Sequence, residues 1–533
     1  MDMRNERGIA LVFVLFLVTT ISALAVSLTF LAQSETISSG NYRLATQARY
    51  AAESGAQNAA DFLLGGAYVA ATAAPGLVDN NAKDSPVLWG GKPVVLSANP
   101  LVPSNYPNPA TQTAFNTAVK GGLTAGSATI GFGAYATLIH EEQFGDAYGG
   151  GNTIVQTWQI TSDGSVIGIR PATVEITSTI ETPKVPAFSY AAFATANGCG
   201  ALTFKGNTGT DSYNSATLPA GTAPTSCPSG TTGPACYKTS GGDVGTNGNM
   251  LIDGGSVDVN GNLSTPRAGV GACTAGNVTA LSGSLSEIGG SPIQLPKAVT
   301  LPTPSIPTPA AGGALKVNNS AKVNSICTDL GLTAANCNVD NSGAVPVITL
   351  QNTNTTPLHL QEIDLSAHAN IVLVASTNPA ITNEYDINAI SLTGGSSIGV
   401  STPAPDAKVV LRVSGKDSSG PIDPAINFDG GTYAAPVGTC TTCSPYDAAL
   451  LQFVYGGTSS VVMTGNSAAS ATFYAPNAPA TLKGTADLYG AIVANTIVVS
   501  GDMNIHYDQQ LQSLAWTHGV PMQTAFSWKN KNN

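Results

Sequence analysis

Eight cysteines are the residues of this chain whose type and number imply chemistry most directly, and none of them precedes residue 199. An even number of cysteines in a segment outside the cytoplasm usually forms disulfides. We therefore predict three local pairs and one long-range pair, although connectivity does not follow from sequence alone: Cys227–Cys236, Cys327–Cys337, Cys440–Cys443 and Cys199–Cys273.

The Cys440-x-x-Cys443 motif has two other interpretations, a redox-active pair and half of a zinc site. Neither a second Cys-x-x-Cys nor a pair of closely spaced histidines accompanies it. We therefore prefer a structural disulfide and predict no metal site.

The histidines, the acidic residues and Arg412 do not form a recognisable catalytic set. The sequence contains no His-Glu-x-x-His, Gly-x-Ser-x-Gly or P-loop motif. A calcium loop starting at Asp243 is rejected because Gly254 occupies the position of its bidentate acid. Arg412 has no clustered acids on its own predicted strand, and we expect His506 to close the end of a β-domain by hydrogen bonds. The sequence thus predicts no catalytic residues, no cofactor and no enzyme.

Composition restricts the function further. Of 533 residues only 10% are charged, and the formal net charge is −11. Such a surface provides no basic stripe for phosphates, so we expect no nucleic-acid partner. Because 43% of the residues are hydrophobic, intrinsic disorder is also excluded.

The N-terminus predicts a membrane helix. A leader over residues 1–8 carries Arg4 and Arg7, and residues 9–31 follow without a charge, a glycine or a proline. This run is long enough to cross a ~30 Å hydrocarbon core, with the two arginines favouring the cytoplasmic side. Small and apolar residues then recur at helical spacing as far as Phe62, so we predict one helix over residues 9–64.

Three interpretations compete for this helix: a cleaved signal peptide ending near Ala25, a plain transmembrane anchor, and a prepilin-type segment. The motif Arg7-Gly8-Ile9-Ala10-Leu11-Val12, with Gln47-Ala48-x-x-Ala51-Ala52-Glu53-Ser54-Gly55, resembles the N-terminal region of PilX-type minor pilins. We favour this third interpretation, and the resemblance covers roughly the first 65 residues.

The resemblance implies cleavage by a prepilin peptidase between Gly8 and Ile9, and methylation of the new Ile9 amine. It also implies other pilins or pseudopilins as partners, with an inner-membrane precursor whose head lies in the periplasm and an extracellular pilus or cell-surface location after assembly. Major pilins carry glutamate at the fifth mature position, where this chain has Phe13. That departure indicates a minor or tip component.

Residues 67–183 predict a small pilin-like β-meander with loops. Strand patterns cover residues 128–138, 153–161 and 166–180, and Ser162-Asp163-Gly164-Ser165 predicts the hairpin turn between the last two.

Residues 187–510 predict a large head of short β-strands. Glycines followed by small or polar residues recur at its corners, as in Gly465-Asn466, Gly484-Thr485 and Gly501-Asp502. This pattern favours a β-solenoid over the alternative of a β-sandwich. A proline-rich segment and an insertion occupy residues 292–345, and residues 511–533 are expected as a C-terminal tail. The end of this region resembles a domain of uncharacterised function found behind PilX-type N-termini.

The sequence therefore predicts an α+β protein: a long N-terminal helix, a small antiparallel sheet and a large, mainly-β domain. The function expected from it is that of a minor pilin-like structural component whose head serves pilus assembly, priming or adhesion. A tip pseudopilin of a type II secretion system and a membrane-anchored, polysaccharide-acting β-helix protein are the alternatives.

Overall fold

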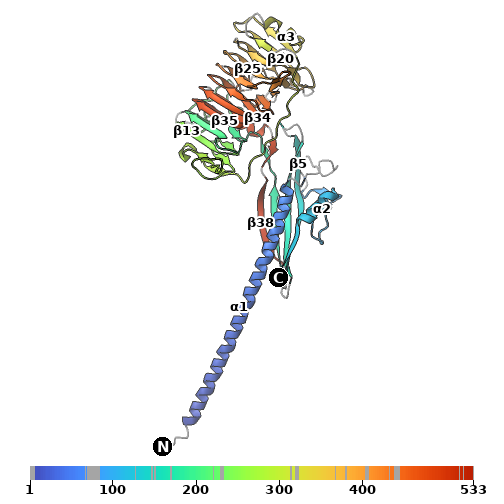
Figure 1. The fold of residues 1–533 in the computed structure, drawn as a ribbon, viewed down its shortest axis with the longest axis vertical. Coiled ribbons are helices and arrows are strands. Elements are labelled where there is room, and N and C mark those ends of the chain that lie inside the picture. Colours follow the sequence, from blue (N-terminus) through green and yellow to red (C-terminus); the bar gives the residue numbers. More distant parts are fainter. Residues whose placement is uncertain are drawn as a thin grey trace. The chain divides into compact units, whose positions relative to one another are not determined.

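The computed structural model divides into two compact units, residues 1–143, 154–183 and 521–533, and residues 144–153 and 184–520. It describes residues 6–65, 68, 85–125, 128–145, 148, 152–167, 171–219, 221–227, 233–311, 315–317, 323–366, 368–378, 381–401, 407–430, 432–436, 444–485, 487–514, 516–519 and 521–531. A long N-terminal helix and a large, mainly-β unit are both present, so the predicted α+β class is confirmed (Figure 1).

The first unit packs the C-terminal half of helix α1 (Glu6–Leu64) against a six-stranded sheet. The sheet order is β3-β5-β6-β7-β38, with β4 paired to β5. Helix α2 (Pro109–Ala118) follows β3 in the chain, with Asn108 capping its N-terminus. The strands of this unit are β1 (Leu88–Trp89), β2 (Lys92–Pro93), β3 (Val95–Ser97), β4 (Lys120–Ala125), β5 (Ala128–Gly145), β6 (Asn152–Ile167), β7 (Ala172–Glu181) and β38 (Met522–Asn530).

Small residues allow α1 to approach this sheet closely. Ala48, Ala52 and Ala59 are completely buried, and Phe62 joins them in the core. A Cβ atom added to Gly164 of β6 would lie 2.0 Å from the Ala48 carbonyl oxygen and 2.4 Å from the Ala52 nitrogen. The helix backbone therefore rests directly on that glycine.

This close approach explains why one predicted turn is wrong. Residues 162–165 continue β6 and pair with β7, with Ser162 opposite Ile176 and Gly164 opposite Val174. Glycine and aspartate are typical of turns, but here the glycine makes room for a helix. Asp163 instead forms an ion pair with Lys531, at 2.7 Å.

The C-terminal residues 511–533, which the sequence analysis expects as a tail, include two paired strands. Strand β37 (Trp516–His518) pairs with β8 (Lys184–Pro186), and β38 pairs antiparallel with β7 over most of its length. The tail prediction is wrong because every residue of β38 is exposed, so the strand carries no alternating hydrophobic pattern. In the chain, residues 184–520 are thus inserted between β7 and β38 of the first unit's sheet.

The second unit consists of parallel coils. Most strands pair in parallel with the third strand after them, as β22 does with β25. The β28–β29 hairpin is not counted in this spacing, so β25 pairs in the same way with β30. Such parallel pairing between successive coils is the arrangement on which the predicted solenoid depends.

Three columns of strands result from this pairing. One contains β18 (Leu315–Val317), β22 (Ile363–Leu365), β25 (Ile390–Leu392), β30 (Ile426–Phe428), β33 (Val461–Met463), β10 (Leu202–Gly206), β13 (Met250–Gly255) and β16 (Leu281–Ser282). The second contains β20 (Val347–Gln351), β23 (Asn370–Val374), β26 (Ser397–Ser401), β31 (Tyr433–Pro436), β36 (Asn504–Asp508), β11 (Gly209–Tyr213) and β14 (Asp258–Val259). The third contains β21 (Leu358–Leu360), β24 (Glu384–Ile387), β27 (Val409–Val413), β32 (Leu451–Tyr455), β9 (Ala192–Ala194), β12 (Val244–Thr246), β15 (Leu263–Thr265) and β17 (Pro292–Gln294).

Strands β34 (Ala468–Gly484) and β35 (Asp487–Gly501) are long enough to contribute to all three columns. Shorter elements complete the unit: β19 (Cys337–Asp340), antiparallel to β20, the hairpin of β28 (Lys416–Asp417) and β29 (Gly420–Pro421), α3 (Ile326–Asp329), and the 3-10 turns η1 (Ser215–Thr217), η2 (Leu285–Glu287), η3 (Val323–Ser325), η4 (Ala448–Leu450) and η5 (Gln509–Ser513).

The order of coils in the stack differs from their order in the chain. Strand β35 pairs on one side with β34 and on the other with β9 and β10, which begin the domain some 300 residues earlier. In Figure 1 the green strand β13 and the red strand β35 accordingly belong to one stack. The coils that come first in the chain therefore lie in the stack next to the coils that come last in the chain.

The proline-rich segment makes this order possible, because it leads from β17 to β18 near the opposite end of the stack. Along this path the Val299 nitrogen donates to Asn247 Oδ1 at 2.7 Å, and Tyr474 Oη donates to the Pro302 carbonyl at 2.8 Å. Farther on, the Ala310 nitrogen donates to Asn388 Oδ1 at 2.9 Å. Proline suits such an extended strap, since it cannot donate to a sheet ladder.

Glycines form a ladder at one corner of the stack. A Cβ atom on Gly484 would lie 1.9 Å from the Gly465 carbonyl oxygen, and one on Gly501 would lie 2.5 Å from that of Gly484. All members have positive φ, as the sequence pattern predicts: Gly394, Gly430, Gly465, Gly484, Gly501, Gly206 and Gly255.

Candidate functional site

The exposed half of α1 is the first candidate. The helix that starts at Ile9 is long and apolar enough to cross a membrane, and its most apolar window is not buried at all. The hydroxyls of Thr19, Thr20 and Ser27 donate to carbonyls one turn earlier in the same helix. The hydroxyls of this segment thus have hydrogen-bond partners within the helix, and its outer surface is apolar. Both properties suit surroundings of lipid or of other apolar helices.

The second candidate is a charged cluster around His506 of β36. Its Nδ1 lies 2.6 Å from Asp211 Oδ1 of β11, and its Nε2 lies 3.7 Å from Asp487 Oδ1 of β35. The imidazole stacks on the rings of both Tyr237 and Tyr489, with centroids 4.1 Å and 4.9 Å away. Three neighbouring coils and one loop thus enclose a single histidine.

Burial by itself lowers the pKa of His506, but the hydrogen bonds and charges of Asp211 and Asp487 outweigh it and raise this pKa to about 9. The imidazolium is therefore the stable form at neutral pH. The charged imidazole links its own coil to the two neighbouring coils through Asp211 and Asp487.

The expectation that His506 closes an end of the domain is wrong. Strand β36 pairs with β35 on one side and β11 on the other, so the histidine lies inside the stack. The hydrogen-bonding role was anticipated, but the neighbouring coil comes from a distant part of the chain.

We expect the second unit to lose stability at alkaline pH. The folded-state pKa of His506, about 9, lies above its ordinary value of 6.5, so the stabilisation is fully present below pH 6.5 and is lost as the pH rises through 9. The loss in the free energy of unfolding should be on the order of 3 kcal/mol. Urea unfolding of the full chain between pH 6.5 and 9.5 measures it.

His506→Gln should remove most of this alkaline slope. His359→Gln, which changes a half-exposed histidine of the same unit, is the control and should keep it. An unchanged slope in the His506 variant would contradict the assignment.

The third candidate is a ladder of charges on neighbouring coils. Arg412 of β27 places Nε 3.2 Å from Asp386 Oδ1 and Nη1 3.2 Å from Glu384 Oε2, both acids belonging to β24. His359 of β21 lies 3.4 Å from the other oxygen of Asp386. Burial raises the pKa of Asp386, although Arg412 and His359 oppose the shift.

The sequence analysis missed this ladder because it looked for acids on the same strand as Arg412. Parallel pairing places Asp386 opposite both Arg412 and His359. The spacing in the sequence could have indicated this alignment, since Asp386 follows His359 by 27 residues and Arg412 follows Asp386 by 26. One coil has about that length here.

The remaining residues singled out from the sequence are not brought together. His140 lies in β5 of the first unit, His518 in β37, and His368 in a turn at φ +51°. Asp243 accepts hydrogen bonds from the backbone and side-chain nitrogens of Asn262, which identifies it as a corner residue. Within the described residues no group of three or more His, Cys, Asp or Glu side chains could hold a metal ion.

Three of the four predicted disulfides are present: Cys199–Cys273, Cys227–Cys236 and Cys327–Cys337. The fourth prediction concerns Cys440 and Cys443, which lie outside the described residues. The first pair closes a loop of 74 residues and so ties the first coil to a later one.

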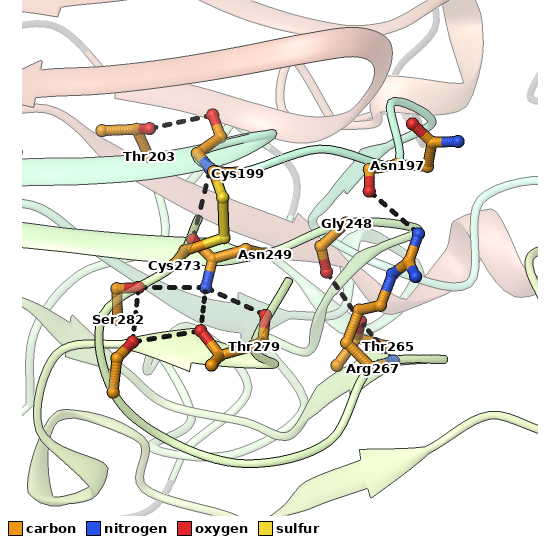
Figure 2. The surroundings of a disulfide bond; sticks show 12 residues. Asn197, Cys199, Thr203, Gly248, Asn249, Thr265, Arg267, Cys273, Thr279 and Ser282 are labelled. Carbon is orange, nitrogen blue, oxygen red and sulfur yellow. Dashed lines mark hydrogen bonds between the residues drawn. A yellow bond between two sulfur atoms is a disulfide. The ribbon is translucent and has the colours of Figure 1, made fainter. Parts of the chain in front are cut away.

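Figure 2 shows the surroundings of this long-range disulfide. Buried Asn249 donates to the Thr279 carbonyl at 3.0 Å and to Ser282 Oγ at 3.1 Å. Arg267 Nη2 donates to the Asn197 carbonyl at 2.9 Å. Side-chain bonds therefore hold together coils that contribute only short strands.

Comparison with known proteins bears on two regions of the chain. Residues 7–57 match the PilX N-terminal family model, and residues 362–514 match a domain of unknown function, DUF7305. The predicted PilX-type N-terminus is thereby confirmed. No curated protein matches the chain.

One similar solved structure is the competence-associated pilin ComZ from Thermus thermophilus. It shares 13% identity, with 92% of this chain and 98% of that chain covered, at a TM-score of 0.23. At that TM-score the similarity carries no argument about fold or function.

Proposed function

This chain carries a PilX-type N-terminal segment ahead of a large, mainly-β domain, and we propose that it is a minor pilin-like structural component of a type IV pilus. The observation that carries the proposal is the helix α1. Its first part is apolar and exposed, while its second part is buried in the first unit. One helix thus offers a surface for assembly and a firm attachment for the rest of the chain.

The precursor would reside in the inner membrane with both units in the periplasm. A prepilin peptidase would cut between Gly8 and Ile9, and the Ile9 amine would be methylated. The apolar residues that faced lipid would then face the helices of other pilins, since both surroundings are apolar. The large unit would remain outside the filament core, for pilus assembly, priming or adhesion.

Phe13 supports a minor or tip position. A carboxylate at this place would cost ~2.5–3.5 kcal/mol in the membrane and would need a partner such as the N-terminal amine of a neighbouring subunit. Phe13 has no such requirement, and its side chain is 73% exposed on α1. The same residue fits a tip pseudopilin of a type II secretion system, which is the second candidate.

We expect the mature protein to begin at Ile9 and to co-purify with sheared pili. Gly8→Arg should leave the precursor uncleaved and absent from the pilus fraction, because the leader would no longer end in the glycine of the prepilin-type pattern. Gly40→Ala is the matched control, since an added Cβ there meets no atom within 4 Å. N-terminal sequencing and immunoblotting of pilus fractions supply the measurements.

A mature N-terminus at Val26 would indicate a signal peptide, and one at Met1 a plain anchor. Correct cleavage with loss of exoprotein secretion, but without pilus association, would favour the pseudopilin. A polysaccharide-acting enzyme would instead show activity on glycans.

A further inference from the structure

A cavity of about 290 Å³ lies on the outer side of the second column of strands. Its lining comes from three consecutive coils of the stack, those of β36, β11 and β14. Its volume is near the lower end of the ~300–1,000 Å³ that small-molecule sites occupy. The space suits a single ring.

One residue of the cavity wall is a glycine, Gly209 of β11. Gly209 pairs with Asn504 on one side and Asp258 on the other, so these three residues form a row across the coils. A Cβ atom on Gly209 would lie 2.5 Å from the Asp258 carbonyl oxygen. The middle of the row therefore contains no side chain, while its two ends carry polar ones.

Amides and carboxylates surround this space. Asn207, Asn260, Asn504, Asp211 and Asp258 all line it. Amides both donate and accept hydrogen bonds, and carboxylates accept up to four. The exposed Asp258 has Asn260 Nδ2 at 3.3 Å, a long hydrogen bond that a ligand hydroxyl could replace.

One lining residue has an unsatisfied polar group. Thr208 is only 2% exposed, and its buried Oγ1 has no hydrogen-bond partner within the described part of the chain. A buried hydroxyl without a partner is unfavourable, because folding has removed its hydrogen bonds to water. This oxygen is not accessible from the cavity, so contacts with a ligand would come from the exposed amides and carboxylates of the lining.

Charge narrows the class of ligand. Two carboxylates, Asp211 and Asp258, line the cavity with a single cation, His506. Asp211 and His506 already pair with each other, which leaves Asp258 uncompensated among the lining residues. An anionic ligand would meet a net negative site, whereas a neutral molecule with many hydroxyls would not.

We propose that this cavity binds one neutral pyranose ring of a surface glycan. Asp258 would accept hydrogen bonds from neighbouring hydroxyls, and Asn207 and Asn504 would serve the others. Tyr237, whose ring stacks on His506, also lines the cavity and would contact the edge of the sugar. The inference rests on the proposed function, since it assigns a chemical target to adhesion by the large unit.

The test uses the full chain, purified in a detergent without a sugar head group, on an array of immobilised glycans. Terminal glucose, galactose, mannose and N-acetylglucosamine are compared with terminal glucuronic and sialic acids. We expect binding to a subset of the neutral glycans, and Asp258→Ala should weaken it by about 10-fold or more. Because Asp258 is exposed, the variant should fold normally.

Asp253→Ala is the matched control. Asp253 is an exposed aspartate of the same coil but does not line the cavity, and its substitution should leave binding unchanged. Binding that is equal in the wild type and the Asp258 variant, a preference for acidic glycans, or no binding to any glycan would overturn the inference.

The two proposals can fail separately. Co-purification with pili without glycan binding would refute the cavity's assignment and leave the pilin proposal intact. Binding to neutral glycans that depends on Asp258, in a protein absent from pili, would refute the pilin proposal and leave the site intact.

Discussion

Replacing Gly484 with alanine should destabilise the second unit by more than about 3 kcal/mol. Gly484 has φ +132°, a conformation that costs an alanine of order 1–3 kcal/mol. In addition, the new Cβ would lie 1.9 Å from the Gly465 carbonyl oxygen, so the two coils would have to separate. Urea unfolding of the full chain, compared with the wild type, measures the change in the free energy of unfolding.

The variant Gly420→Ala distinguishes backbone strain at positive φ from steric overlap with the neighbouring coil. Gly420 has nearly the same φ, +138°, but an added Cβ there meets no atom within 4 Å. This control should therefore show only the cost of backbone strain. If both variants lost the same stability, close stacking of glycines would not be what holds this corner together.

Gly164→Ala should release α1 from the sheet of the first unit, with a loss of roughly 2–4 kcal/mol. Its Cβ would overlap with the backbone at Ala48 and Ala52, and a helix backbone cannot rotate away as a flexible side chain can. Hydrogen exchange in residues 44–63 should accelerate, because the buried stripe of the helix lies there.

Gly131→Ala in β5 provides the comparison for this second variant. The nearest atom to its added Cβ is the Gly121 carbonyl oxygen at 3.7 Å, an ordinary contact distance. Protection of residues 44–63 should remain as in the wild type. Unchanged protection in the Gly164 variant as well would mean that α1 does not rest on this glycine.

The consequence for the proposed function is direct. If the first part of α1 lies in a filament, its second part is the attachment through which the filament holds the rest of the chain. A Gly164 variant should then be processed normally at Gly8, but an added protease should cut the rest of the chain from pili more readily, because α1 would no longer be packed on the sheet. Processing and attachment would thus be separable in one protein.

The sequence predicted the features that depend on residues close to one another in the chain. The apolar run of residues 9–31 predicted a helix because length and composition are local properties. The corner glycines were identified for a similar reason, since only glycine readily adopts positive φ in a tight corner. Two of the three disulfides found join cysteines 9 and 10 residues apart.

Mispredictions arose where a distant segment changes the meaning of a local pattern. Gly164 next to Asp163 is typical of a turn, and only the arrival of α1 makes it a position inside a strand. Strand β38 lacks hydrophobic alternation, and only its pairing with β7 identifies it. In both cases the partner lies more than 100 residues away.

The charged clusters and the cavity belong to the tertiary structure alone. His506 and Asp211 are 295 residues apart, and they meet because the proline-rich strap lets the first coils stack onto the last ones. Composition and local spacing determined a long apolar helix, glycine corners and two local disulfides, since these need only neighbouring residues. Which polar side chains face one another depends on the order of the coils in the stack. That order is set by pairing between strands that are far apart in the chain.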